Sequence, residues 1–276
     1  MIYDLHTHTT ASDGKYNPGE LIELADSAGI NVLSITDHDS ISGLAEARQA
    51  AQQKNISLVS GVELSVRWCN KNFHVVGLNI NVDDQSLTSS LDEHKQLREI
   101  RAIQIGEKLD KCGIPGIYSG AKQLAGNEAI TRNHFARILV ARGYAKNIKD
   151  VFKKYLVKNK PGYVKTRWMD MENGVRLINQ SGGTAVLAHQ LRYKLSGSWL
   201  NKLLDAFKHV GGQGIEIVTG TSTPDEIQLT ADYARKYDLY GSVGSDFHGH
   251  ELIDNRLGKL EKLPDDILPI WDCWSC

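Results

Sequence analysis

Residues 1–8 read Met-Ile-Tyr-Asp-Leu-His-Thr-His, an apolar strand pattern over 2–5 that leads directly into His6 and His8. Side chains at positions i and i+2 of an extended chain point the same way, so both imidazoles can reach one metal ion. A single pair of this kind is common by chance. It gains weight only if other strands of the chain end in the same kind of residue.

The strand pattern recurs along the chain. Further strand-like runs are predicted at 31–36, 57–62, 73–80, 184–188, 214–218 and 240–243. Helical patterns such as 18–28, 43–54 and 224–237 separate most of them, and this alternation predicts a parallel sheet. Seven such units, with no glycine-rich dinucleotide fingerprint after the first strand, predict an α/β fold that forms a closed or nearly closed (β/α) barrel.

Six of these strands carry or lead into histidines and carboxylates, nearly all of them at or near a carboxyl end, where barrel enzymes assemble their sites. They are His6, His8, Asp13, His38, Glu63, His74, His189, Asp246 and His248. Buried imidazoles and carboxylates must be compensated, so nine of them at one rim predict a metal site rather than independent core residues. Ligands of these types, without cysteine, suit two or three divalent ions, and we expect Mn²⁺ ahead of Zn²⁺ or Fe²⁺.

Charge is distributed unevenly, although 32 Lys+Arg and 33 Asp+Glu give a net charge of −1. Residues 86–167 show helical patterns and no convincing strand, and they hold 17 basic and 7 acidic residues. We therefore predict a basic helical insertion at 86–167 in a barrel formed by 1–85 and 168–276. A surplus of ten positive charges favours a role in binding a polyanionic substrate, although solvated helices are often lysine-rich as well.

Together these motifs resemble the polymerase-and-histidinol-phosphatase (PHP) family of metal-dependent phosphoesterases, in the family's order and over essentially the whole chain. The resemblance implies a distorted, TIM-like (β/α)₇ barrel with a trinuclear metal site. It places His6, His8, Glu63 and Asp246 at one metal, with Glu63 bridging to a second metal bound by His74 and His189. The third metal would be bound by Asp13, His38 and His248. One departure is Gln190, where such proteins usually have proline.

Two segments of the insertion, 131–137 and 158–164, resemble the subgroup that includes ribonuclease AM and 3′,5′-nucleoside-bisphosphate phosphatase. In this interpretation Arg132 and His134 contact a phosphate. His134 as a metal ligand, and both residues as ordinary members of a helix N-terminus, are the alternatives. The other expected substrate contacts are Arg98, Arg101, Lys160 and Tyr163, with solvated side chains as the alternative for the two arginines.

The resemblance implies hydrolysis of a phosphate ester by a metal-bridging hydroxide, with Arg132 at the non-bridging oxygens and Asp246 or His248 assisting proton transfer. The surplus of positive charge favours a substrate with several phosphates. We therefore predict an enzyme that removes the 5′-phosphate of nucleoside 3′,5′-bisphosphates, digests short 5′-phosphorylated RNA in the 5′→3′ direction, or does both. A histidinol-phosphate-type phosphatase and a non-catalytic metal- or nucleic-acid-binding module are the alternatives. Base stacking or core packing is expected of four aromatic residues, Trp68, Phe73, Tyr163 and Trp168.

The remaining features concern the compartment. The chain has no run of roughly 18 apolar residues that could form a membrane helix. Its first residues lack the regions of a signal peptide, and four scattered cysteines do not form a disulfide framework. We expect a cytoplasmic protein with a nucleotide or short RNA as its partner, no membrane association and no obligate protein partner.

Overall fold

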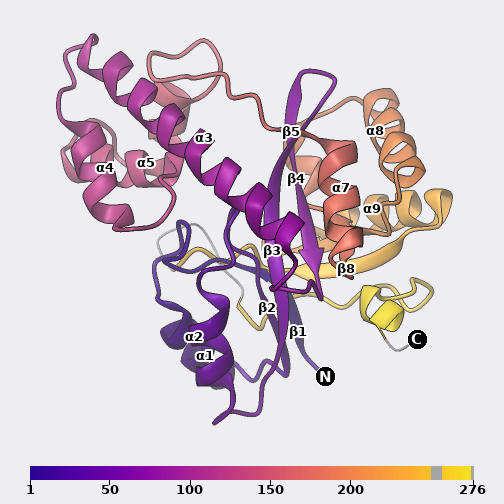
Figure 1. The fold of residues 1–276 in the computed structure, drawn as a ribbon. Coiled ribbons are helices and arrows are strands. Elements are labelled where there is room, and N and C mark those ends of the chain that lie inside the picture. Colours follow the sequence, from indigo (N-terminus) through magenta and orange to yellow (C-terminus); the bar gives the residue numbers. More distant parts are fainter. Residues whose placement is uncertain (250–256, 275–276) are drawn as a thin grey trace.

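The computed structural model describes residues 1–249 and 257–274, and its strands form a nearly closed barrel (Figure 1). In order across the sheet the strands are β1 (Tyr3–Thr7), β2 (Val32–Ile35), β3 (Ser57–Trp68), β4 (Lys71–Leu78), β6 (Thr184–Leu187), β7 (Gly214–Thr219) and β8 (Tyr240–Gly244). A two-residue strand, β5 (Met169–Asp170), pairs with the end of β3.

Backbone hydrogen bonds just beyond β8 bring this strand against β1. The amide of Asp246 donates to the carbonyl of His6 at 2.8 Å, and the amide of His8 donates to the carbonyl of Phe247 at 2.9 Å. The approach requires glycine at position 244, because a Cβ there would lie 2.3 Å from the Cβ of His6. The predicted α/β barrel of seven strands with a helical insertion is confirmed.

The prediction of a parallel sheet is wrong for β4, which pairs antiparallel with both β3 and β6. β3 continues to Trp68 instead of ending near residue 62, and it turns into β4 through Cys69 and Asn70 alone. Both turn residues have positive φ, 46° and 60°, as a tight hairpin turn requires. A parallel connection needs a dozen or more residues, so two can only reverse the chain. The start of β4 therefore lies at the same rim as the ends of its neighbours.

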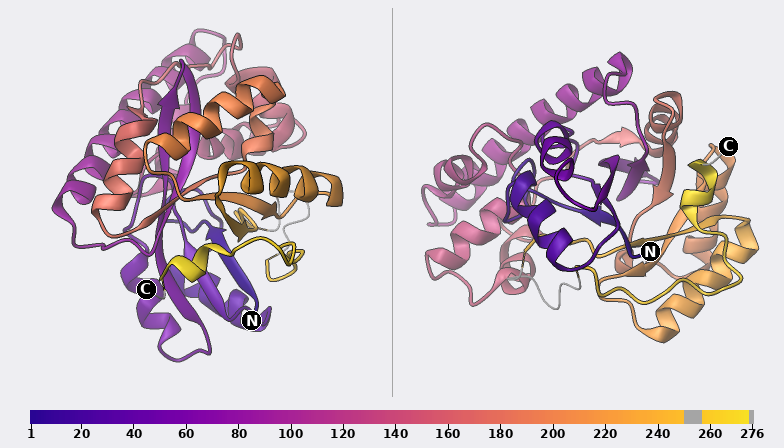
Figure 2. Two further views of the ribbon diagram at one scale, coloured as in Figure 1. Left: turned by 90° about the vertical axis from the view of Figure 1, so that its right-hand side faces the viewer. Right: turned by 90° about the horizontal axis from the view of Figure 1, so that it is seen from below.

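Five helices pack around the barrel (Figure 2). They are α1 (Pro18–Ser27), α2 (Leu44–Ala51), α7 (Met171–Gln180), α8 (Gly197–His209) and α9 (Pro224–Tyr237). Helix α1 begins where the sequence predicts, because Pro18 occupies its first turn and Asn17 and Glu20 form a capping box. The buried faces of α7, α8 and α9 share one apolar core with β3, β6 and β7, which fixes the strand ends in place.

The insertion projects to one side of the barrel (Figure 1). It contains α3 (Gln85–Asp110), α4 (Ile117–Ala125), α5 (Arg132–Ala141) and α6 (Ile148–Val151), followed by a π-helical turn at Phe152–Leu156. These helices enclose an apolar cluster of their own, which includes Leu109, Ile117, Phe135 and Leu139. The division of the chain at 86 and 167 stays a prediction. Among the described residues, no helix is both long enough and apolar enough to cross a membrane.

Candidate metal centre and anion pocket

The nine predicted metal ligands converge at one rim of the barrel. Those on or after parallel strands lie toward the carboxyl ends of β1, β2, β6 and β8, as expected. His74 lies near the start of β4 and reaches the same rim because this strand runs in the opposite direction. Six of the nine are buried: His6, His8, Asp13, Glu63, His189 and His248.

Glu63 is the centre of this arrangement and is fully buried. Five imidazole nitrogens lie within 3.4 Å of its two oxygens. Oε1 of Glu63 lies 2.8 Å from His74 Nδ1, 2.9 Å from His189 Nε2 and 3.4 Å from His6 Nε2. Oε2 of Glu63 lies 2.7 Å from His38 Nδ1 and 3.4 Å from His8 Nε2. Burial alone would raise the pKa of Glu63, but His74, His38 and His6 hold that pKa well below its usual range.

Four groups of side chains bring one ligand atom each to within 4.8 Å of one another. The groups are His8–Asp13–His38–His248, His6–Glu63–His189, His6–His8–Asp246 and His38–Glu63–His74. Neighbouring groups share members, which is the arrangement that closely spaced ions need. His38 lies with Glu63 and His74 as well as with Asp13, so the geometry does not divide into the three separate sets that the resemblance implies. The assignment of each residue to one ion stays a prediction.

The residues fit a cluster of divalent ions of the first transition row. Imidazole nitrogens and carboxylate oxygens are the ligands that such ions accept, and no thiolate is present among these four groups. Two buried carboxylate oxygens, Asp13 Oδ1 and Glu63 Oε2, accept no hydrogen bond from the described residues, although imidazole nitrogens face both. A cation in these positions would compensate the two oxygens.

Glu216 on β7 orients His6, and the sequence reasoning missed it. One carboxylate oxygen lies 2.5 Å from His6 Nδ1, and the other accepts the amide hydrogen of His189 at 2.6 Å. This leaves Nε2 of His6 facing Glu63 and the other ligands, the arrangement by which a carboxylate fixes a metal-binding imidazole. The sequence signal that could have identified Glu216 is its carboxylate inside the otherwise apolar run 214–218. In the structure Glu216 is buried, with 1% exposure.

Two of the predicted ligands have strained backbones. Asp246 and His189 adopt left-handed conformations with φ of 56° and 31°, which cost of order 1–3 kcal/mol each and persist where the surroundings over-determine them. Asp246 also forms an ion pair with Arg192. His248, two residues further, places its Nδ1 2.9 Å from the carbonyl oxygen of Asp246, which leaves Nε2 facing Asp13 at 3.1 Å.

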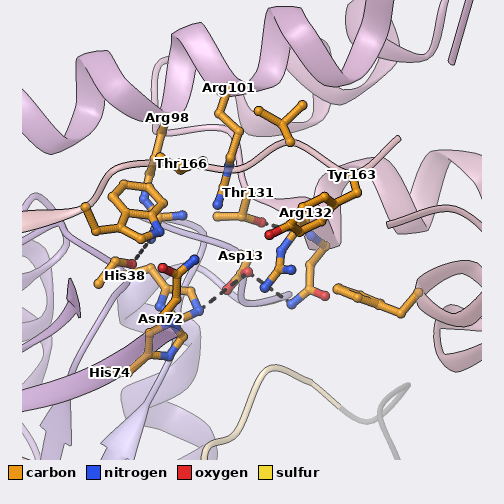
Figure 3. Close-up of a pocket in the computed structure, with 15 residues that line it drawn as sticks. Asp13, His38, Asn72, His74, Arg98, Arg101, Thr131, Arg132, Tyr163 and Thr166 are labelled. Carbon is orange, nitrogen blue, oxygen red and sulfur yellow. Dashed lines mark hydrogen bonds and ion pairs between the residues drawn. The ribbon is translucent and has the colours of Figure 1, made fainter. Parts of the chain in front are cut away.

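A cavity opens beside the ligand groups (Figure 3). The barrel contributes Asp13, His38 and His74 to its lining. The facing side comes mainly from the insertion and is rich in cations and aromatic rings. Its members include Arg98, Arg101, Arg132, Phe152, Tyr163 and, just beyond the insertion, Trp168.

The three arginines of this cavity differ in how they are held. Arg98 donates from Nε and Nη2 to Oδ2 of Asp39 at 2.8 and 2.5 Å. Arg101 is 8% exposed and packs 5.0 Å from the ring centre of Trp168, and its Nε has no hydrogen-bond partner among the described residues. Burial, together with the neighbouring arginines, lowers the pKa of Arg101 and of Arg132. Buried guanidinium groups in excess of carboxylates favour an anionic ligand.

A buried network that the sequence reasoning missed holds Arg98 in place. Oδ1 of Asp39 accepts the amide hydrogen of Ser65 at 2.6 Å and lies 2.9 Å from His94 Nδ1. Burial would raise the pKa of Asp39, but Arg98 and His94 hold it below its usual range. The pair His94 and Arg98 lies on α3, so this network also docks the insertion on the barrel.

Two predicted substrate residues do not line the cavity. His134 accepts the amide hydrogen of Thr131 at Nδ1 and completes the capping box of α5, and burial lowers its pKa to about 4. Lys160 is exposed in the loop after the π-helical turn. Arg132, at the first position of α5, does line the cavity, and the next residue, Asn133, donates to Oδ2 of Asp13 at 3.0 Å. The roles of all these residues stay predictions.

The four aromatic candidates separate into two pairs. Tyr163 and Trp168 line the cavity, although Arg98 and Arg101 pack over the ring of Trp168 at 5.1 and 5.0 Å. Trp68 and Phe73 contact each other outside the cavity, and Phe73 is buried in the barrel core. Of the four, Tyr163 therefore presents the ring most suited to contact a base.

Comparisons with known proteins bear on the whole chain. The model of the PHP domain matches residues 4–164. A "5′-3′ exoribonuclease" of Haemophilus influenzae is 45% identical over 98% of this chain and 98% of its own length, and a "3′,5′-nucleoside bisphosphate phosphatase" of Chromobacterium violaceum is 40% identical over 97% and 94%. A solved structure of an amidohydrolase from the same organism, with bound sulfate, superimposes with a TM-score of 0.94 at 40% identity, covering 99% of this chain and 95% of that one. The chain belongs to the PHP domain family.

Proposed function

We propose that this chain is a metal-dependent phosphoesterase that removes the 5′-phosphate of nucleoside 3′,5′-bisphosphates, releases nucleotides from the 5′ end of short RNA, or does both. One observation carries the proposal. The cavity brings three arginines of the insertion face to face with the histidine and carboxylate groups of the barrel (Figure 3). The names of the relatives from Haemophilus influenzae and Chromobacterium violaceum support the same two activities.

We assign the metal to the four ligand groups and propose Mn²⁺ as its identity. Divalent ions bound there would lower the pKa of a water molecule to about 7 and stabilise charge on the attacking and leaving oxygens. The protein's part is to fix the ligands: Glu216 orients His6, and the carbonyl of Asp246 orients His248. Asp246 and His248 stay the candidates for proton transfer, since they belong to two ligand groups that share His8.

The arginines would hold the phosphate. Arg98 is preset by Asp39, while Arg101 and Arg132 have no carboxylate partner among the described residues. A phosphate dianion between these guanidinium groups and the metal ligands would compensate both sides at once. We therefore propose that residues 86–167 form the substrate-binding part of the chain.

The test compares three substrates under one set of conditions. Purified protein loaded with Mn²⁺ is incubated with a nucleoside 3′,5′-bisphosphate, a 5′-phosphorylated oligoribonucleotide and histidinol phosphate, and released phosphate and nucleotides are measured. Turnover of either of the first two, lost in His38→Ala, supports the proposal. Preference for histidinol phosphate, full activity of His38→Ala or inert protein contradicts it.

Nucleotide substrates of this kind favour the cytoplasm as the compartment.

A further inference from the structure

The segment 146–167 presents two different sides. Phe152, Tyr163, Val164 and Thr166 line the cavity, as does Trp168 immediately after the segment. The same segment carries eight basic residues, and all of them are exposed: Lys146, Lys149, Lys153, Lys154, Lys158, Lys160, Lys165 and Arg167. We call these eight residues the basic strip. Residues of the cavity wall and of the basic strip thus belong to one continuous stretch of chain, which includes the π-helical turn and the loop that returns to β5 (Figure 1).

The charges of the basic strip are not compensated within the part of the chain that the structure describes. Asp150 is the single acidic residue of the segment, and none of the eight cations forms an ion pair with a described carboxylate. Some cations of the barrel are paired: Lys54 pairs with Glu23 and Asp26, and Arg235 pairs with Asp232 and Asp266. Clustered like charges without partners raise the local potential and attract a polyanion.

Resting on the function proposed above, we propose that the basic strip binds the phosphate backbone of an RNA strand, on the 3′ side of the nucleotide held in the cavity. A nucleoside bisphosphate would be bound by the arginines that line the cavity. A longer strand with its 5′-phosphate at the metal ligands must continue out of the cavity. The exposed lysines lie on the same segment that forms the cavity wall.

Binding of a nucleoside bisphosphate and binding of an RNA strand would therefore depend on different residues of one site. Hydrolysis of a bisphosphate requires the cavity alone, whereas RNA gains affinity from each phosphate that a lysine neutralises. For single strands, log affinity falls with log salt by about 0.7 per neutralised phosphate, so four such contacts give a slope of about 3. The basic strip would make RNA binding strongly salt-dependent and leave the bisphosphate much less sensitive.

The experiment uses the full chain with four lysines exchanged: Lys153→Gln, Lys154→Gln, Lys158→Gln and Lys165→Gln. The matched control exchanges four exposed lysines of α8, α9 and the C-terminal segment: Lys202→Gln, Lys236→Gln, Lys259→Gln and Lys262→Gln. Steady-state kinetics are measured on a nucleoside 3′,5′-bisphosphate and on a 5′-phosphorylated ten-nucleotide RNA at several salt concentrations. Fluorescence anisotropy of the RNA with the metal-free chain gives binding without turnover.

We expect the strip variant to raise KM and Kd for the RNA at least about tenfold and to lower the salt slope by about 3, with less than a twofold change on the bisphosphate. The control variant should match the unmodified chain. RNA affinity that is unchanged, or that falls equally in both variants, overturns the inference while bisphosphate turnover still upholds the proposed phosphoesterase. If neither substrate is turned over, the proposed function fails, and the anisotropy measurement still decides whether the basic strip binds RNA.

Discussion

The two regions that meet at the cavity are built from opposite chemistry. The rim of the barrel brings imidazole nitrogens and carboxylate oxygens together around Glu63, and bound cations would compensate these groups. The insertion presents Arg98, Arg101 and Arg132, a collection that is complete only with an anion. The difference shows how one site divides its work. In the proposed function, the strand ends would hold the metal ions and the helices of the insertion would bind the substrate.

The strongest test of this division is removal of the central carboxylate. Glu63→Gln keeps the shape of the side chain but removes the charge that five imidazoles surround. We expect bound metal to fall and turnover to drop by more than the roughly 100-fold that is typical for residues that only orient a ligand. Metal content is measured by elemental analysis beside the rate. The near-normal metal content expected of Arg101→Met provides the contrast, and full metal with full activity in Glu63→Gln would refute the central role of this residue.

The next effect belongs to the residue that orients His6. Glu216→Gln should weaken metal binding or activity about 10–100-fold, because His6 loses the carboxylate that fixes its ring while all nine predicted ligands remain. The readout is the metal concentration at half-maximal activity together with Kd from calorimetry. Glu226→Gln, on the exposed capping box of α9, is the control, since it lies on the neighbouring helix and contacts no predicted ligand. Unchanged Kd in Glu216→Gln would show that the contact has no role in metal binding.

The positions of the rim residues could be predicted from the sequence better than the contacts of the insertion, because they depend on local geometry. His6, His38 and His189 were predictable because a strand followed directly by a polar residue fixes where the side chain points. The reversal of β4 was not anticipated, because the decisive feature is a two-residue turn inside an unbroken β pattern. His74 was placed at the right rim although its strand direction was misjudged.

For the insertion, the residue types were informative but their partners were not. Arg98 and Arg101 were expected to share one helix face, and both do line the cavity. The partner of Arg98, however, is Asp39, which lies 59 residues away in sequence, and such contacts exist only after folding. His134 shows the same limit, since its imidazole completes a helix cap that the sequence does not distinguish from a phosphate contact.

Arg101→Met tests whether the insertion binds the phosphate of the substrate. Loss of a hydrogen bond to a charged group costs about 1.5–3 kcal/mol, so KM for the bisphosphate and the inhibition constant of inorganic phosphate should rise about tenfold or more. The same change removes a buried cation without a partner, so the melting temperature should rise by about 2–4 °C for each kcal/mol gained. Weaker substrate binding with higher stability identifies a group held for its ligand. Lower stability with unchanged KM would identify a packing residue instead.

The smallest expected effect concerns the protonation of His38 and His248, two histidines that flank the carboxylate of Asp13. Burial alone would lower the pKa of His248, but Asp13 and Asp246 raise it to about 9, whereas burial lowers the pKa of His38 to about 4. Glu216, Glu63 and Asp246 also raise the pKa of His6 well above its usual range, against the effect of burial. A metal ligand must be unprotonated, so at pH 7 metal binding has to displace a proton from His248 and one from His6, but none from His38. Apparent metal affinity should therefore rise with pH up to about pH 9, and the proton on His248 should contribute about tenfold per pH unit to that rise. Calorimetry in buffers of different ionisation enthalpy counts the protons released. His248→Gln should lower the count by one and flatten the pH dependence, while a count that is unchanged would place the displaced proton on another group.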